Sequence, residues 1–174
     1  ISSSPHKRAS VSTKRIMLDV IIALIPCLIA SIIHFGLRAL ALVIVCVLTS
    51  ILSEYLSRKV MKRENTIDDL SAVVTGMLLA FNLPVTLPLW MAVLGSIVAI
   101  VVVKQFFGGL GQNFVNPAIA GRIILTLCFA GPMTNFIEHG FSLWAIDGTT
   151  GATPLAETIH GYGQMPSYMD LFLG

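Results

Sequence analysis

Charged residues are scarce in this chain of 174 amino acids, of which 11% are charged and 55% are hydrophobic. Soluble domains average about 25% charged residues, and a small soluble fold has too little interior to hide so much apolar surface. The composition therefore excludes an ordinary soluble domain and indicates a lipid environment. The formal net charge is only +2, so the chain has no basic footprint for nucleic acid and we expect no nucleic-acid partner.

Cysteine is also sparse. Cys27, Cys46 and Cys128 each lie in an apolar run, and the sequence contains no Cys-x-x-Cys pair and no Cys/His cluster. We interpret the three as small buried hydrophobic residues. Their number excludes a four-cysteine iron–sulfur site within this chain, and we expect no metal site. A redox role would need an organic cofactor, or cysteines from another subunit.

Apolar runs predict five membrane spans, since one span needs about 20 apolar residues. The first run is too long for the apolar core of a signal peptide, so we expect it to be retained. The third and fifth runs are short, which is compatible with tilted or broken helices buried among the others. The five runs are Ile16–Ile33, Ala39–Leu56, Leu70–Leu83, Val85–Val103 and Ala118–Met133.

Helix-start signals accompany the two short runs. Thr66-x-x-Asp69 has the pattern of a capping box placed before Leu70. Asn116 followed by Pro117 provides a helix N-cap and then proline at the first helical position. These signals predict helices that begin close to residues 70 and 117.

The distribution of lysine and arginine predicts the orientation. With a cytoplasmic N-terminus and five spans, nine of these residues face inward and only Arg38 faces outward, while Arg122 lies within the fifth span. The nine are Lys7, Arg8, Lys14, Arg15, Arg58, Lys59, Lys62, Arg63 and Lys104. We therefore expect a cytoplasmic segment 1–15, a transmembrane region 16–133 and an external loop 134–174. The odd number of spans is the critical assumption, because losing one short span would move the loop inside.

Three charged residues fall within the predicted spans, where charge is costly. They are Asp19, Glu54 and Arg122. Two interpretations stay open. The residues could pair or extend to the cytoplasmic interface, or they could form an ion or proton relay.

A glycine-rich stretch, Gly108–Asn113, precedes the fifth span. It could be a tight turn between two packed spans, or it could hold an anion on its backbone amides. The lysine and hydroxyl residue of a P-loop are missing, which argues against a nucleoside triphosphate site. Gly76 and Gly95, within spans, are expected to permit close helix packing.

The external loop contains a small, hydroxyl-rich turn between Asp147 and Pro154. Gly151 and Ala152 leave room for a bulky group to approach the backbone, and Pro154 holds Thr153 away from helical geometry. An accessible threonine hydroxyl can form a phosphoester. Without further information, however, the turn indicates a polar loop and nothing more.

This turn also carries a resemblance to a known family. Asp147-x-x-Thr150-Gly151-Ala152-Thr153 matches the flavinylation motif Asp-x-x-Ser/Thr-Gly-Ala-Ser/Thr. The similarity continues in Ser2-Ser3-Ser4-Pro5-His6, in Ile16-Met17-x-Asp19-Val20-Ile21-x-Ala23-Leu24-Ile25-Pro26 and in Gly108-Gly109-Leu110-Gly111-x-Asn113-x-x-Asn116-Pro117-Ala118. Over nearly its whole length, the chain resembles the family that comprises the D subunit of the Rnf complex and the B subunit of the sodium-pumping NADH:quinone reductase.

The resemblance implies a cofactor and its site. A flavin transferase would join FMN through its phosphate to Thr153, while Asp147, Thr150, Gly151 and Ala152 complete the attachment motif. The subunit would be an electron carrier without catalytic residues or an NAD site of its own. Its complex would link ferredoxin and NAD to the export of sodium ions or protons. A noncovalent riboflavin or quinone site stays open.

The resemblance also implies the architecture. The fold would be all-α, with five spans forming one repeat of an inverted-repeat, urea-transporter-like bundle, and the second repeat would be missing from this chain. The partners would be Rnf subunits A, B, C, E and G, the flavin transferase and the lipid of the bacterial inner membrane. Two alternatives remain: a channel or transporter for a small solute without a redox cofactor, and a structural subunit with an unmodified threonine.

Overall fold

The computed structural model describes residues 12–135 and residue 169, and every regular element within 12–135 is helical. In order, these elements are α1 (Thr13–Phe35), α2 (Leu37–Val60), the 3-10 helix η1 (Ile67–Asp69), α3 (Ser71–Phe81), α4 (Leu89–Ile97), the π-helix η2 (Val98–Gln105), α5 (Pro117–Cys128) and α6 (Ala130–Met133). The expected all-helical class is confirmed for this part of the chain. The number of membrane crossings and the inverted-repeat fold stay predictions.

Two of the described helices are long and apolar enough to cross a membrane, namely α1 with 23 residues and α2 with 24. Each is about 35 Å long, compared with a hydrocarbon layer of about 30 Å. Helix α4 continues directly into η2, and together they form one continuous apolar helix over Leu89–Gln105. Helices α3 and α5 have 11 and 12 residues, which cover only about 17 Å each. Both therefore need protein around them to shield their ends from lipid.

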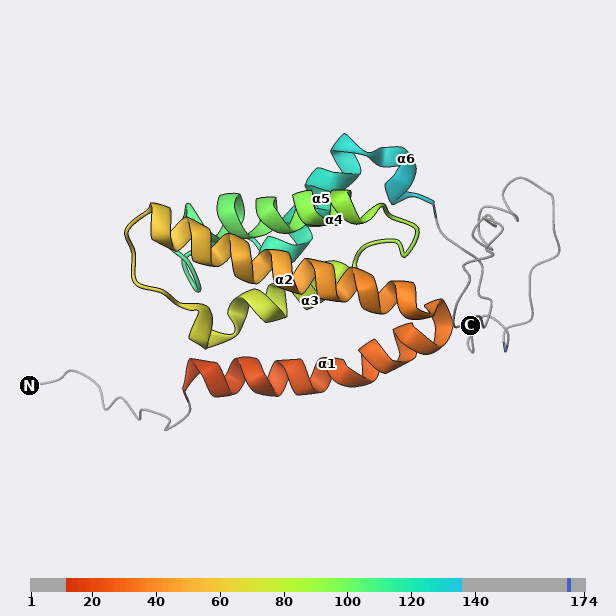
Figure 1. Cartoon of the computed structure of the whole chain (residues 1–174), viewed down its shortest axis with the longest axis horizontal. Helices are drawn as coiled ribbons and strands as arrows, with labels where there is room; N and C mark the ends of the chain where they lie inside the picture. The colour runs from red at the N-terminus through yellow and green to blue at the C-terminus, as the bar shows by residue number, and fades with distance from the viewer. Residues whose placement is uncertain (1–11, 136–168, 170–174) are drawn as a thin grey trace, which may run out of the picture.

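The helices run back and forth between two ends of the bundle (Figure 1). One end, here called the basic end, holds the start of α1, the end of α2, the start of α3 and the end of η2. At this end, the Arg63 guanidinium donates a hydrogen bond to the Gln105 carbonyl oxygen at 3.2 Å, which joins the segment after α2 to the end of η2. Its basic residues are Lys14, Arg15, Arg58, Lys59, Lys62 and Arg63.

The opposite end, here called the tail end, holds the turn between α1 and α2, residues 82–88 and α6 (Figure 1). Arg38 donates to the carbonyl oxygens of Val85 and Leu87 at 3.1 and 3.2 Å. The Thr86 hydroxyl donates to the Asn135 carbonyl oxygen at 2.7 Å. The described chain thus starts at the basic end and reaches Asn135 at the tail end.

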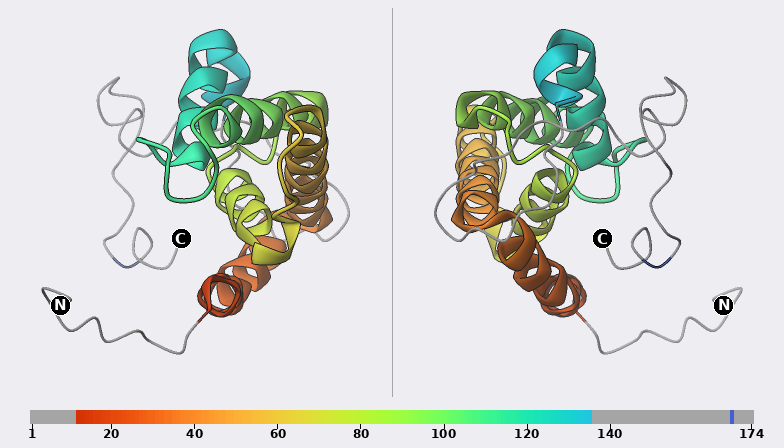
Figure 2. Two further views of the ribbon diagram at one scale, coloured as in Figure 1. Left: turned by 90° about the vertical axis from the view of Figure 1, so that its left-hand side faces the viewer. Right: turned by 90° about the vertical axis from the view of Figure 1, so that its right-hand side faces the viewer.

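Helix α2 packs against α1, α3, α4 and η2. Helix α1 lies at the edge of the bundle (Figure 2). No residue of α1 is buried. Between α2 and α3 the backbones approach closely at Gly76, where an added Cβ would lie 2.8 Å from the Cα of Val47. An added Cβ on Gly95 would meet the side chain of Leu125 on α5. The prediction that these two glycines permit close packing is confirmed.

The cysteine prediction is right for one residue and wrong for two. Cys46 on α2 is fully buried, whereas Cys27 and Cys128 are exposed at the bundle surface. Cys27 is exposed because α1 lies at the edge, and Cys128 because it stands at the end of the short helix α5.

Of the two helix-start predictions, one is confirmed and one is wrong. The Asn116 side chain accepts a hydrogen bond from the Ala118 backbone N–H at 2.9 Å, directly before α5. Thr66, however, does not cap α3: the helix begins at Ser71 with Leu70 in the N-cap position, and the Thr66 hydroxyl instead donates to the Glu54 carboxylate at 2.9 Å. Asp69 instead accepts from the Ser71 backbone N–H at 2.8 Å.

Candidate functional site: a buried ion pair at the basic end

A glutamate and a lysine meet inside the bundle near its basic end. Glu54 on α2 and Lys104 on η2 have relative exposures of 0% and 2%, and the Lys104 Nζ lies 2.9 Å from the Glu54 Oε2. The two residues are 50 positions apart in the sequence. Burying an ion pair costs desolvation free energy, and the attraction between the charges offsets this cost only when hydrogen bonds satisfy their remaining atoms.

Those hydrogen bonds come from three further residues. The Glu54 Oε1 accepts from the Thr66 hydroxyl and from the Gln105 side-chain amide, both at 2.9 Å. The Lys104 ammonium also donates to the Ser71 hydroxyl at 2.6 Å. We refer to Glu54, Thr66, Ser71, Lys104 and Gln105 as the Glu54 cluster. It joins α2, the segment before η1, the start of α3 and the end of η2.

Two neighbouring residues of η2 point into the cluster. Lys104 and Gln105 are both buried, and both bond to the same carboxylate. They lie in a π-helix, whose wider turn is also visible in the hydrogen bond from the Phe106 N–H to the Val101 carbonyl oxygen at 3.1 Å. Short π-helical segments occur frequently at functional sites. The sequence predicts that Lys104 faces the cytoplasm, just after the fourth apolar run. The structure instead buries its side chain as the partner of Glu54.

Two buried side-chain oxygen atoms of α2 and η2 have no hydrogen-bond partner among the described residues. They are the Gln105 Oε1 and the Ser50 Oγ, and both side chains are 0% exposed. The Gln105 amide already contacts Glu54 through its nitrogen, so its oxygen is close to the same carboxylate. Ser50 precedes Glu54 by one turn on the same face of α2. Within the cluster, the Gln105 Oε1 is therefore an acceptor that the described donors leave unsatisfied.

The other two charged residues of the predicted spans lie outside the cluster. Asp19 is exposed on α1. Arg122 on α5 donates a hydrogen bond to the Asn82 Oδ1 at 3.0 Å, which ties α5 to the end of the other short helix, α3. Of the pairing and relay interpretations, pairing is therefore observed for Glu54. Neither Asp19 nor Arg122 is brought into contact with it.

The glycine-rich stretch forms a turn between η2 and α5. Gly108, Gly109 and Gly111 have φ angles of 116°, 106° and 81°, which glycine adopts at little cost. The Gly108 and Gly109 amides donate to the carbonyl oxygens of Gln105 and Lys104 at 3.2 and 3.0 Å. Because the turn itself uses these amides, the tight-turn interpretation is confirmed and these two groups are not free to hold an anion.

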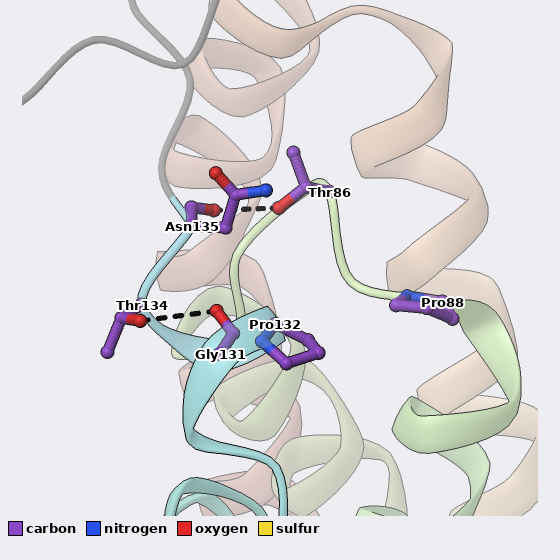
Figure 3. Close-up of a pocket in the computed structure, with 6 residues that line it drawn as sticks. All are labelled: Thr86, Pro88, Gly131, Pro132, Thr134 and Asn135. Atoms are coloured by element: carbon purple, nitrogen blue, oxygen red, sulfur yellow. Dashed lines mark hydrogen bonds between the residues drawn. The ribbon is translucent and has the colours of Figure 1, made fainter.

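The tail end carries an open cavity of about 500 Å³ (Figure 3). The Thr86 hydroxyl donates to the Asn135 carbonyl oxygen at 2.7 Å on its rim, and the Thr134 hydroxyl donates to the Gly131 carbonyl oxygen at 3.2 Å. Its lining residues are Thr86, Pro88, Gly131, Pro132, Thr134 and Asn135. The predicted attachment residues, Asp147 and Thr150 to Thr153, lie outside the described residues.

Comparison with known proteins identifies a family and several relatives that the chain resembles. The NQR2, RnfD, RnfE family matches it over residues 1–174. The chain is 51% identical over its full length to the D subunit of the Na(+)-translocating ferredoxin:NAD(+) oxidoreductase complex of Acetobacterium woodii, of which it covers 54%. It is 38% identical over its full length to the D subunit of the proton-translocating ferredoxin:NAD(+) oxidoreductase complex of Clostridium ljungdahlii, of which it covers 55%.

A third relative is the D subunit of the ion-translocating oxidoreductase complex of Yersinia pseudotuberculosis, which is 39% identical over 92% of the chain, covering 48% of that protein. The chain thus spans about half the length of the curated relatives that it matches. Because the family match and the relatives at 51% and 38% identity extend over all 174 residues, the chain belongs to the NQR2, RnfD, RnfE family.

Proposed function

We propose that this chain forms part of a membrane subunit of an ion-translocating ferredoxin:NAD oxidoreductase complex. The support comes from relatives that carry this activity in their names and match the chain over its full length. The complex would contain Rnf subunits A, B, C, E and G beside this one. The NAD site would lie elsewhere in the complex.

Within that subunit, we propose that FMN is attached through its phosphate to the Thr153 hydroxyl. The single observation that carries this proposal is the motif Asp147-x-x-Thr150-Gly151-Ala152-Thr153. Gly151 and Ala152 add almost no bulk beside the acceptor hydroxyl, which gives a flavin transferase access to it. When bound, the flavin supplies the electron-transfer chemistry, and the chain's own residues hold it in place.

The proposed topology has five crossings in the bacterial inner membrane, with the basic end in the cytoplasm. It is supported by the six lysines and arginines at the basic end, and by Arg38 at the tail end. It is supported also by the position of Asn135, which lies at the tail end and accepts a hydrogen bond from Thr86. Residues 134–174, including Thr153, would then lie outside. A second repeat supplied by the rest of the subunit would shield the short helices α3 and α5.

Flavin fluorescence on a denaturing gel tests the attachment. The subunit is produced together with its native flavin transferase and viewed under ultraviolet light, so that only covalent flavin is seen. We expect a fluorescent band that Thr153→Ala abolishes and Thr149→Ala, the matched control in the same turn, retains. Thr150→Ala should weaken the signal through transferase recognition. A dark wild-type band, or a bright Thr153→Ala band, would contradict the proposal.

A channel or transporter for a small solute is the second candidate. The observation that favours it is the pair of short helices, α3 and α5, joined by the Arg122–Asn82 hydrogen bond. Discontinuous helices of this kind often line transport sites. This candidate predicts solute uptake by vesicles that contain the purified subunit, and no covalent flavin. It leaves the threonine motif unexplained.

A further inference from the structure

We propose that the outer face of α2 binds an anionic phospholipid, with its phosphate at Lys59 and Lys62 and an acyl chain along the helix toward Leu48. This inference goes beyond the proposed function and does not depend on the flavin or on the other subunits. It requires only that α2 crosses the membrane, for which its 24 residues are long and apolar enough.

One face of α2 is left uncovered by the rest of the described bundle, along whose side this helix lies (Figure 2). Residues three or four positions apart lie on the same face of a helix, and Ile44, Leu48, Leu52 and Tyr55 follow this spacing. Their relative exposures lie between 41% and 61%. Cys46, by contrast, is fully buried on the opposite face. In a membrane, such an apolar row contacts acyl chains or another apolar helix.

The apolar row ends at four basic residues that have no acidic partner. Arg58, Lys59, Lys62 and Arg63 follow one another closely, and none of them forms an ion pair with a carboxylate of residues 12–135, including that of the neighbouring Glu64. The two arginines already donate to backbone carbonyl oxygens, at 3.4 and 3.2 Å. The two lysines are exposed and donate no hydrogen bond to another described residue, so their ammonium groups are available to an anion.

Tyr55 and Lys59 form the junction between the apolar row and the basic residues. The Lys59 Nζ lies 5.9 Å from the centre of the Tyr55 ring. Tyrosine is typical of the level where the hydrocarbon layer meets the headgroups, because its ring is apolar and its hydroxyl is polar. Leu48 precedes Lys59 by eleven residues, or about 16 Å of helix, which is close to half of a hydrocarbon layer of about 30 Å. The face therefore matches one lipid leaflet in length.

The unpaired positive charge decides which lipid fits this face. A phosphatidylcholine headgroup carries its own cationic amine beside the phosphate and has no net charge for the two lysines to attract. A phosphatidylglycerol headgroup has the same phosphate without the amine, so it is a net anion. Each lysine or arginine beside an anionic headgroup strengthens binding by about fivefold. The face therefore selects an anionic lipid through Lys59 and Lys62.

The test uses the purified complex, with the full-length subunit, in phosphatidylcholine nanodiscs. Phosphatidylglycerol with a photoreactive group on its acyl chain is added in increasing amounts, and mass spectrometry locates the adducts after irradiation. We expect adducts at Leu48 and Leu52, with half-maximal labelling at a lower mole fraction than photoreactive phosphatidylcholine requires.

Substitutions of exposed lysines show whether charge selects the lipid. Lys59→Gln should raise the mole fraction of phosphatidylglycerol for half-maximal labelling of α2 by about fivefold, and Lys59→Gln combined with Lys62→Gln by about tenfold or more. Lys14→Gln is the matched control, because it removes one exposed lysine at the same end of the bundle, on α1. It should leave the labelling of α2 unchanged.

Two results would overturn the proposal. One is equal labelling of α2 by both lipids with no effect of the lysine substitutions, which is what unselective contact with bulk lipid predicts. The other is a wild-type complex without adducts on α2, which would mean that another protein helix covers this face. Gel fluorescence of the same samples reports the flavin on Thr153 separately, so the lipid site and the proposed function stand or fall independently.

Discussion

Alanine at position 76 should force helices α2 and α3 apart. A Cβ added to Gly76 would lie 2.8 Å from the Val47 Cα and 2.9 Å from the Cys46 carbonyl oxygen, whereas ordinary van der Waals contact begins at 3.4 Å. Both atoms belong to the α2 backbone and cannot rotate away. Overpacking in a well-packed core costs about 1–3 kcal/mol, and we expect Gly76→Ala to fall in the upper half of this range because only a helix displacement relieves the contact.

The thiol of Cys46 provides the assay, because it is fully buried on α2 at the same helix contact. Cys27 and Cys128 are exposed and would be replaced by alanine, so that a maleimide dye reports on Cys46 alone. The purified protein is unfolded in detergent by heat, and the labelling rate of Cys46 gives the fraction unfolded. Gly76→Ala should lower the midpoint of this transition.

Two other glycines serve as controls of graded severity. A Cβ on Gly95 would meet only the Leu125 side chain, which can change its rotamer, so Gly95→Ala should cost less than Gly76→Ala. A Cβ on Gly131 would meet nothing within 4 Å, so Gly131→Ala should leave the transition nearly unchanged. If Gly76→Ala were as stable as Gly131→Ala, the close backbone contact between α2 and α3 would be refuted.

Three further predictions can be checked with the same thiol assay. Asn116→Ala should lower the free energy of unfolding by about 1 kcal/mol, because α5 loses its N-cap, whereas Asn116→Asp should retain most of it. Arg122→Leu and Asn82→Leu should be non-additive, with a coupling energy of about 0.5–3 kcal/mol, and additive effects would show that this hydrogen bond does not join α3 to α5. Glu54→Gln alone should cost about 3–5 kcal/mol, because it leaves the Lys104 ammonium buried and unpaired. Adding Lys104→Met should recover most of that loss, and a failure to recover would indicate that the cluster is not a paired-charge unit.

Local signals predicted local structure well where no stronger partner competed. Asn116 caps α5 as expected because its side chain and the capped amide are two residues apart. Thr66 has the same capacity to cap a helix. It fails to do so because α3 begins only at Ser71, and the Thr66 side chain is held instead by its hydrogen bond to the Glu54 carboxylate, twelve residues away in sequence.

The ion pair could not be predicted from the sequence, which singled out Glu54 but not its partner Lys104. Glu54 was noted as a charge within a span, and such a residue needs a partner. Lys104 gave no comparable signal, because a lysine that ends an apolar run usually marks a membrane interface. Their contact depends on how η2 packs on α2, and no pattern in the sequence joins two positions 50 residues apart.

Hydropathy identified the long helices more securely than the short ones. The predicted spans Ile16–Ile33 and Ala39–Leu56 correspond to α1 and α2, whose length follows from an uninterrupted apolar sequence. The run Leu70–Leu83 gives only the 11-residue helix α3, because the chain leaves helical geometry after Phe81, ahead of Pro84. Hydropathy gives the apolar extent of a segment, whereas its backbone conformation also depends on the residues that end the helix.

Fragment mass spectrometry of the peptide around Thr153 tests the proposed flavin attachment most directly. The peptide is taken from the subunit produced with its native flavin transferase, and fragmentation assigns any added mass to a single residue. We expect one FMN, joined through its phosphate to Thr153, and none on Thr149 or Thr150. An unmodified Thr153, or a flavin on either neighbouring threonine, would contradict the attachment.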